Sequence, residues 1–215
     1  MLAIIAPGQG SQTPGMLSAW LKDSTLRDTC AAWSLEIGID LLTLGTSADA
    51  EEIKDTANAQ PLIVAAGLLS FKALGVTPSV VAGHSVGEIT AASLATIISE
   101  TDAMRIVTAR GFEMAKAAAI TPAGMSAVLG GEREAVVAAI TAAGLVAANE
   151  NGGGQIVAAG SLDALEKLAA NPPEGARVRA LAVAGAFHTS YMQPAVEPLR
   201  ALAQSLSPTE PTVPV

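Results

Sequence analysis

The chain has 215 residues, enough to bury a sizeable core as one large domain or as one domain with a smaller insert. Half of the residues are hydrophobic but only 3% are aromatic, which favours an α/β class with close-packed helices on a sheet. The net charge of −8 and the pI near 4.7 argue against a protein that binds nucleic-acid phosphates. Cys30 is the single cysteine, which excludes an intramolecular disulfide and a cysteine-rich metal site.

The apolar segments of the chain are too short for a membrane span and do not resemble an export signal. The longest apolar runs, such as residues 62–69, are interrupted well before the ~20 residues that a membrane span needs. Residues 1–6 are apolar but have no basic leader and are followed at once by Pro7 and Gly8, so they predict a strand rather than a signal peptide. We therefore expect a cytoplasmic protein with no transmembrane helix, no nucleic-acid partner and no metal.

Apolar periodicity and turn residues predict the first half of the chain. The continuous apolar run over residues 2–6 predicts a buried strand at the centre of a sheet, and Gly75 is a C-terminal stop signal for the helix before it. Ser99 and Asp102 resemble a capping box that begins a helix. The predicted elements are a strand over 2–6, two or three helices up to 44, a helix over 57–74, a strand over 78–82, a helix over 89–98, and a helix from 99 that Pro122 and Gly124 end.

From Met125 onward the order of elements becomes β-α-β-β-α-β, the split pattern of a ferredoxin-like unit that can bury its own small core. We expect a small domain over residues 124–184, inserted into a discontinuous large domain over 1–123 and 185–215. The predicted elements are strands over 125–130, 145–149, 155–160 and 177–183, and helices over 132–143, 161–170 and 191–206.

The segment Gly83-His-Ser85-Val-Gly87 fits the G-x-S-x-G nucleophile elbow and lies between a predicted strand and a predicted helix. In that setting the serine Oγ projects at the end of the sheet, and the amide of Val86 at the helix start points toward a developing oxyanion. The alternative is an ordinary strand-to-helix turn. The matching context favours Ser85 as a nucleophile.

A serine hydroxyl needs a positioned base, and the chain has only two histidines, His84 and His188. The side chain of His84 projects away from the adjacent Ser85, which favours packing or support of the elbow. His188 is predicted on a loop after a strand, a usual position for a catalytic group. It is the better base, although a structural, hydrogen-bonded histidine fits the pattern too.

The loop Pro7-Gly-Gln-Gly-Ser-Gln12 follows the first predicted strand, and its glycines allow the backbone to approach a ligand. It lacks the Gly-Lys-Ser/Thr ending of a Walker loop and the further glycine of a dinucleotide fingerprint. Acyl transfer requires two donors aimed at one oxygen, so the amide of Gln9 is a candidate for the second oxyanion donor.

Arg110 lies on a predicted helix among small or apolar neighbours. Its guanidinium can bind a carboxylate through two parallel hydrogen bonds, which would select acyl groups that end in a free carboxylate. A surface arginine paired with Glu113 or Asp102 explains the spacing equally well.

Together these motifs, with Asn149-Glu-Asn151 and Gly185-Ala-Phe-His188, closely resemble the malonyl-CoA:acyl-carrier-protein transacylases in order and spacing. The acyltransferase domains of polyketide synthases are similar too. The resemblance covers the whole chain. It implies an α/β-hydrolase-like large domain with an inserted ferredoxin-like domain.

The resemblance also implies roles for individual residues, and no cofactor. Ser85 would be the nucleophile, His188 the base, and the amides of Gln9 and Val86 the oxyanion hole. Phe187 would narrow the pocket toward malonyl, as the Ala-Phe-His segment does in malonyl-type polyketide acyltransferases. The implied substrate-binding residues are Arg110, Gln9, His84, Phe187, Asn149 and Met114.

The implied reaction transfers malonyl from malonyl-CoA to the phosphopantetheine thiol of an acyl carrier protein, in fatty-acid or polyketide synthesis, with a monomeric enzyme. Relatives usually continue for ~70 to 100 residues beyond Pro214, so the C-terminal part of the large domain is expected to be missing. Two alternatives remain at this point. One is a serine hydrolase or thioesterase, and the other is a non-catalytic carrier-binding fragment.

Overall fold

A computed structural model describes residues 1–183 and 185–215, which form two compact units. Unit 1 comprises Met1–Phe112 and Leu199–Val215, and unit 2 comprises Glu113–Pro198. Ala184, the last residue of the predicted small domain, lies outside the described residues.

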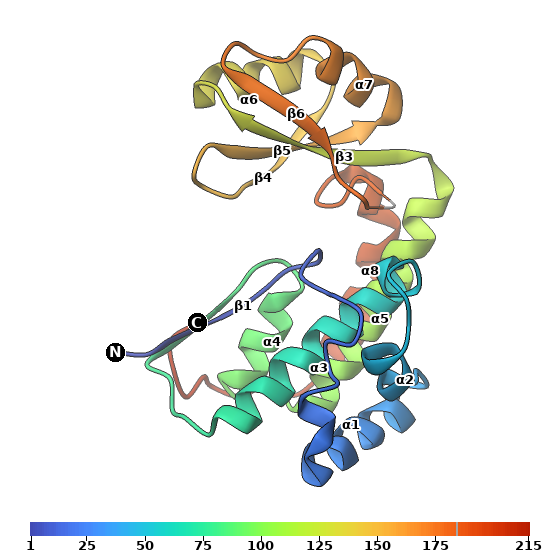
Figure 1. Cartoon of the computed structure of the whole chain (residues 1–215), viewed down its shortest axis with the longest axis vertical. Helices are drawn as coiled ribbons and strands as arrows, with labels where there is room; N and C mark the ends of the chain where they lie inside the picture. The colour runs from blue at the N-terminus through green and yellow to red at the C-terminus, as the bar shows by residue number, and fades with distance from the viewer. Residues whose placement is uncertain (184) are drawn as a thin grey trace. The chain divides into compact units, whose positions relative to one another are not determined.

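Unit 1 has a parallel pair of strands and a largely helical core (Figure 1). Its elements are β1 (Ala3–Ala6), η1 (Trp20–Lys22), α1 (Ser24–Ile37), α2 (Leu41–Thr46), η2 (Glu52–Lys54), α3 (Thr56–Leu74), β2 (Val80–Gly83), α4 (Gly87–Leu94) and the first part of α5 (Glu100–Ile120). Strand β1 pairs with β2 in the register Ala3↔Val80 to Ala6↔Gly83, so the carboxyl ends of both strands lie side by side.

The start and end of the unit 1 helices follow from capping. Asp55 accepts a hydrogen bond from the amide of Ala57 at the start of α3, and Gly75 ends that helix in the left-handed region, with φ of 59°. At the start of α5 the Ser99 hydroxyl accepts the Asp102 amide at 3.0 Å, as the capping-box pattern predicts.

The predicted buried, central position of the first strand is wrong. Ile5 is 74% exposed, and β1 has a single strand neighbour among the described residues. Its apolar run is continuous, but helix α4 packs against both strands while the Ile5 side chain of β1 stays exposed. Helix α4 ends at Leu94 rather than residue 98, because the chain turns at Thr96, which has a φ of 64°.

The last residues of the chain pack within unit 1. The amide of Val81 in β2 donates to the carbonyl of Pro214 at 3.0 Å, and that of Thr212 donates to the carbonyl of Ala95 at 2.9 Å. Val213 packs against the core of the unit. The proline-rich tail is therefore ordered along β2 and the turn after α4.

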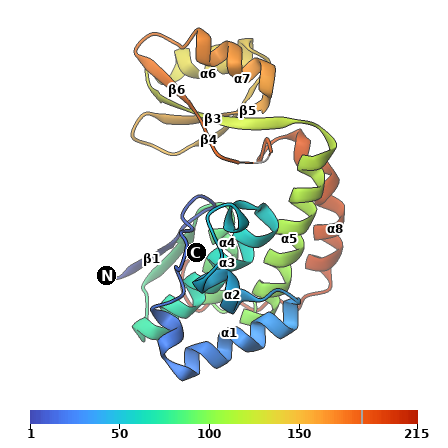
Figure 2. The same cartoon turned by 45° about the vertical axis from the view of Figure 1, so that its right-hand side comes forward.

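Unit 2 is a four-stranded antiparallel sheet in the order β4-β5-β3-β6, with α6 and α7 on one face (Figure 2). Its elements are the last part of α5, β3 (Ala123–Gly130), α6 (Arg133–Ala142), β4 (Val146–Glu150), β5 (Gln155–Ser161), α7 (Leu162–Ala170), β6 (Ala176–Ala180), η3 (Ser190–Met192) and the first part of α8 (Gln193–Gln204). Alternate residues of β3 and β5, such as Val128 and Ile156, pack against Ile140 and Leu165 from the two helices.

The predicted order β-α-β-β-α-β is observed, with differences at the boundaries. Gly124 lies inside β3 and pairs with Gly160, so it does not end the preceding helix, which stops at Ile120 before Pro122. Strand β6 ends at Ala180 rather than residue 183, after its last pairing with β3 at Ser126.

Helix α3 is the one described helix with the length and hydropathy to cross a membrane. Half of its most apolar window is buried within the protein. The core helix of a folded domain passes the same test, so this feature is weak evidence for a membrane span.

Candidate active site

Ser85 occupies the sharp turn between β2 and α4, with a φ of 54°. This left-handed conformation is uncommon for a residue with a side chain and is typical of a nucleophile elbow. The amides of Gly87, Glu88 and Ile89 donate to the carbonyls of the three residues that begin the turn, at 3.0–3.1 Å. The backbone is thus fixed while the Ser85 side chain stays half-buried.

The two glycines of the elbow are required by close backbone packing. A Cβ at Gly83 would collide with the backbone of Gly87, and one at Gly87 would collide with the carbonyl of Ala6 at the end of β1. Val86 between them is fully buried in the core of unit 1. These contacts join the elbow to the end of β1.

His84 lies on the exposed side of the elbow and contacts the first loop. Its amide donates to the carbonyl of Ala6 at 3.0 Å, and a Cβ on Gly8 would come within 2.5 Å of its Nδ1. The histidine ring therefore packs over the backbone of the loop, as expected for a residue that supports the elbow.

The loop over residues 7–12 lies beside the elbow because β1 and β2 are parallel and end together. The amide of Gly10 donates to Gln12 Oε1 at 2.8 Å, and the Ser11 hydroxyl donates to the carbonyl of Gly8 at 2.9 Å. The Gln9 side chain turns toward α3, where its Nε2 donates to the hydroxyl of Thr56 at 3.1 Å. These bonds fix the loop that carries the Gln9 amide.

Arg110 on α5 reaches the elbow serine. Its Nη2 donates to Ser85 Oγ at 3.3 Å, and its Nη1 donates to Gln60 Oε1 at 2.7 Å. The residues considered as its surface partners pair elsewhere: Asp102 lies 3.7 Å from Arg105, and Glu113 lies 2.8 Å from Lys116.

The electrostatic setting of Arg110 favours an anion. Burial lowers the pKa of the Arg110 guanidinium, and the charge of Glu88 acts in the opposite direction. The guanidinium donates to two neutral side-chain oxygens, which leave its charge in place, so a ligand carboxylate beside Ser85 would pair with it.

The remaining predicted site residues belong to unit 2. His188 is exposed and has a φ of 59°, and it lies in the segment between β6 and η3. Phe187 before it is 5% exposed, and the Thr189 hydroxyl donates to the carbonyl of Ala186 at 2.6 Å. This segment is therefore held by its own packing, while the pairing of His188 with Ser85 stays a prediction.

Two other predicted residues lie elsewhere in unit 2. Asn149 is on β4, directly after a register shift against β5 that begins at Ala147. Met114 is on α5 and is 6% exposed. Their roles in substrate binding also stay predictions.

Comparisons with known proteins bear on this geometry. The acyl transferase domain family matches residues 4–215. The malonyl CoA-acyl carrier protein transacylase of Mycobacterium tuberculosis H37Rv is 54% identical over 99% of this chain and 72% of its own length. The chain belongs to the malonyl CoA-acyl carrier protein transacylase family.

Solved structures of this transacylase family agree. The crystal structure of MCAT from Mycobacterium tuberculosis has a TM-score of 0.95 and 53% identity over 99% of this chain and 72% of that one. A solved complex of a type II PKS acyl-carrier protein with its malonyl-transacylase contains a chain with a TM-score of 0.90 and 30% identity. The match covers 100% of this chain and 73% of that one. The mixed α/β fold is thus shared with these transacylases.

Sequence reasoning missed two residues that contact this candidate site, Gln60 and Thr56. Both lie on α3 and are almost fully buried, at 1% and 2% exposed. Gln60 Nε2 donates to Gln9 Oε1 at 3.3 Å, so Gln60 connects Gln9 with Arg110, while Thr56 accepts a hydrogen bond from Gln9. The signal in the sequence was polar residues near the start of a largely apolar helix, because polar side chains that become buried need hydrogen-bond partners.

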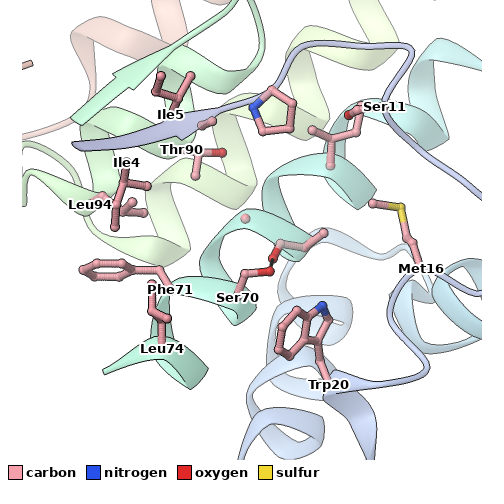
Figure 3. Close-up of a pocket in the computed structure, with 15 residues that line it drawn as sticks. Ile4, Ile5, Ser11, Met16, Trp20, Ser70, Phe71, Leu74, Thr90 and Leu94 are labelled. Carbon is pink, nitrogen blue, oxygen red and sulfur yellow. Dashed lines mark hydrogen bonds between the residues drawn. The ribbon is translucent and has the colours of Figure 1, made fainter. Parts of the chain in front are cut away.

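A separate apolar pocket of about 380 Å³ lies in unit 1 between β1 and helices α3 and α4 (Figure 3). Trp20, Phe71 and Leu74 contribute much of its apolar wall, and Ser70 and Thr90 are polar residues at its surface. The described lining contains none of the predicted site residues. Among residues 1–183 and 185–215, no cluster of three or more His, Cys, Asp or Glu side chains could hold a metal ion.

Proposed function

We propose that this protein transfers a malonyl group from malonyl-CoA to the phosphopantetheine thiol of an acyl carrier protein. The observation that carries the proposal is the contact of 3.3 Å between Arg110 Nη2 and Ser85 Oγ on a strained strand-to-helix turn. It places a carboxylate-binding group directly beside a serine with the conformation of a nucleophile. The family's transacylases carry this activity in their name.

In the first half-reaction Ser85 Oγ attacks the thioester carbon of malonyl-CoA. His188 accepts the hydroxyl proton as the new O–C bond forms, and the amides of Gln9 and Val86 bind the oxyanion. The C–S bond then breaks, and the proton moves from the imidazolium to the sulfur of CoA. The product on the protein is a malonyl ester of Ser85.

In the second half-reaction the carrier's thiol attacks this ester by the reverse steps. His188 accepts the thiol proton and returns it to Ser85 Oγ when the C–O bond breaks. Atoms and electrons balance without a redox group, so we propose that no cofactor is needed. The solved complex of a type II PKS acyl-carrier protein with its malonyl-transacylase supports a carrier as the partner.

Arg110 would bind the malonyl carboxylate while the thioester lies over Ser85. A fork of two guanidinium N–H groups recognises a planar carboxylate and has no matching group on acetyl. Phe187 would limit the space for a branched acyl chain. We further propose that His84, Asn149 and Met114 line the path of the substrate.

The architecture fits this proposal. We propose that unit 2 is a ferredoxin-like domain, since its strand order β4-β5-β3-β6 is the order 2-3-1-4 within the unit. Unit 1 would then be part of an α/β-hydrolase-like large domain, with the small domain inserted over about 124–184. We also propose a cytoplasmic monomer that acts in fatty-acid or polyketide synthesis.

Product analysis tests the proposed reaction. Incubation with malonyl-CoA and a phosphopantetheinylated carrier should yield malonyl-carrier, and Ser85→Ala should yield none. A serine hydrolase would instead release free malonate at the same rate with or without the carrier. If the unsubstituted protein forms no malonyl-carrier and releases no malonate, the proposal is rejected and a non-catalytic carrier-binding role is favoured.

A further inference from the structure

We propose that Gln60 is a positioning residue that sets the preference of the site for an acyl group with a free carboxylate. This inference rests on the proposed function and concerns a residue that the reaction itself does not use. Gln60 lies on the largely apolar helix α3 and is 1% exposed. A buried amide in such a place is unfavourable unless its polar atoms are hydrogen-bonded.

Both ends of the Gln60 amide are hydrogen-bonded to the candidate site. Its Oε1 accepts from Arg110 Nη1 at 2.7 Å, and its Nε2 donates to Gln9 Oε1 at 3.3 Å. Gln9 Nε2 then donates to the hydroxyl of Thr56 at 3.1 Å. The Gln60 amide therefore connects Arg110, which contacts Ser85, with the side chain of Gln9. The backbone amide of Gln9 is a proposed oxyanion donor.

The direction of these bonds is fixed by chemistry. A guanidinium has donors only, so the oxygen of Gln60 must face Arg110 and its nitrogen must face Gln9. The oxygen of Gln9 in turn faces Gln60, and its nitrogen faces Thr56. A residue without both a donor and an acceptor at position 60 would break this order.

The two helices that carry Gln60 and Arg110 are packed closely together. A Cβ on Gly111, next to Arg110, would lie 2.8 Å from the carbonyl of Thr56, so α5 and the start of α3 are in close contact. Asp55 fixes the same end of α3 by accepting the Ala57 amide at 2.8 Å. The distance between Arg110 and Gln60 is therefore set by the packing of the two helices.

The neutrality of Gln60 is as important as its shape. An amide oxygen orients the guanidinium without cancelling its charge, so the charge remains for a ligand carboxylate. A glutamate at this position would accept the same hydrogen bond but would pair with Arg110 permanently and repel the malonyl group. Gln60 thus holds Arg110 in place and leaves it available.

The test compares second-order rate constants for acylation of Ser85 by malonyl-CoA and by acetyl-CoA, followed by intact mass. Arg110→Ala defines the full loss of carboxylate preference. Gln60→Glu should reduce the malonyl rate by roughly 100-fold and the acetyl rate by less than roughly threefold. Gln204→Glu, on an exposed residue of α8, makes the same charge change and should leave both rates unchanged.

Gln60→Met keeps the side-chain length without polar ends, and should lower the ratio of malonyl to acetyl rates by roughly tenfold. It carries the test alone if circular dichroism shows that Gln60→Glu is unfolded. An unchanged ratio in a folded Gln60 variant overturns the inference. Failure of the unsubstituted protein to form the malonyl adduct is a separate result, which rejects the proposed function.

Discussion

The two units are built in different ways: the core of unit 2 follows a regular sequence pattern, whereas the candidate site of unit 1 is assembled from distant segments. Unit 2 gains its core from a regular alternation on β3 and β5 against α6 and α7, which are near neighbours in the chain. In unit 1 the polar groups around Ser85 come from three other segments of the chain, at Gln9, Gln60 and Arg110. The first kind of order is local and periodic, whereas the second depends on tertiary packing.

Substitution of His188 is the strongest test of this comparison, because His188 lies in unit 2 and is the proposed base for Ser85 in unit 1. His188→Ala should slow acylation of Ser85 by malonyl-CoA roughly 1000-fold, because the hydroxyl loses its base. Added imidazole should restore part of the rate. Rapid-quench intact-mass measurement gives the rate, and Gln193→Ala on the exposed surface of unit 2 serves as the control.

Wild-type acylation rates in His188→Ala would break the proposed link between the units. A slow rate that imidazole does not restore would indicate that the histidine supports its segment instead. That segment is already held by the Thr189 hydroxyl and by the buried Phe187, so a folding defect is not expected.

A matched pair of core substitutions sharpens the comparison at the level of stability. Ile140 in α6 and Leu69 in α3 are both fully buried, in unit 2 and unit 1 respectively. Each substitution to alanine should cost about 3 kcal/mol through lost burial and the cavity left behind. Amide hydrogen exchange should rise mainly in the unit that carries the substitution.

Equal increases of exchange in both units from either variant would contradict the account of two separate cores. Urea unfolding of the same proteins gives the free energies of unfolding.

The smallest expected effect concerns a helix start in unit 1. Asp40 accepts from the amide and the hydroxyl of Thr43, at 3.1 and 2.6 Å, and these hydrogen bonds lower the pKa of its carboxyl. Asp40→Ala should cost about 1 kcal/mol at neutral pH through loss of the N-cap. Asp40→Asn, which keeps an acceptor, should cost less.

The pH dependence of this effect has a definite sign. A lowered pKa in the folded state means that the ionised carboxylate contributes stability above its ordinary pKa, and that this contribution is lost as the pH falls through the lowered value. The difference between wild type and Asp40→Ala should therefore shrink below about pH 4. Urea midpoints across the acid range measure it, and a difference that grows on acidification would contradict this explanation.

The sequence predicted the features that depend on local pattern. The order of elements in unit 2 and the left-handed end of α3 at Gly75 follow from periodicity and from single capping residues. The strained turn at Ser85 follows from the glycines on either side of it.

Features that depend on contacts between distant segments could not be predicted in this way. The run over residues 2–6 is apolar whether one face or both faces of the strand are covered, so it did not reveal that Ile5 is exposed. Gly124 resembled a helix stop but pairs within β3. Gln60 carried no motif, and its hydrogen bonds to Gln9 and Arg110 depend on how α3 packs against the loop and α5.

The most direct test of the central claim is to map the acyl group on the protein after a brief incubation with malonyl-CoA. Peptide mass spectrometry should find a malonyl ester on Ser85, between the two elbow glycines, and the modified peptide should disappear when a phosphopantetheinylated carrier is added. A malonyl group on any other residue, or an unmodified Ser85 in a folded protein, would contradict the claim that this serine carries the acyl group.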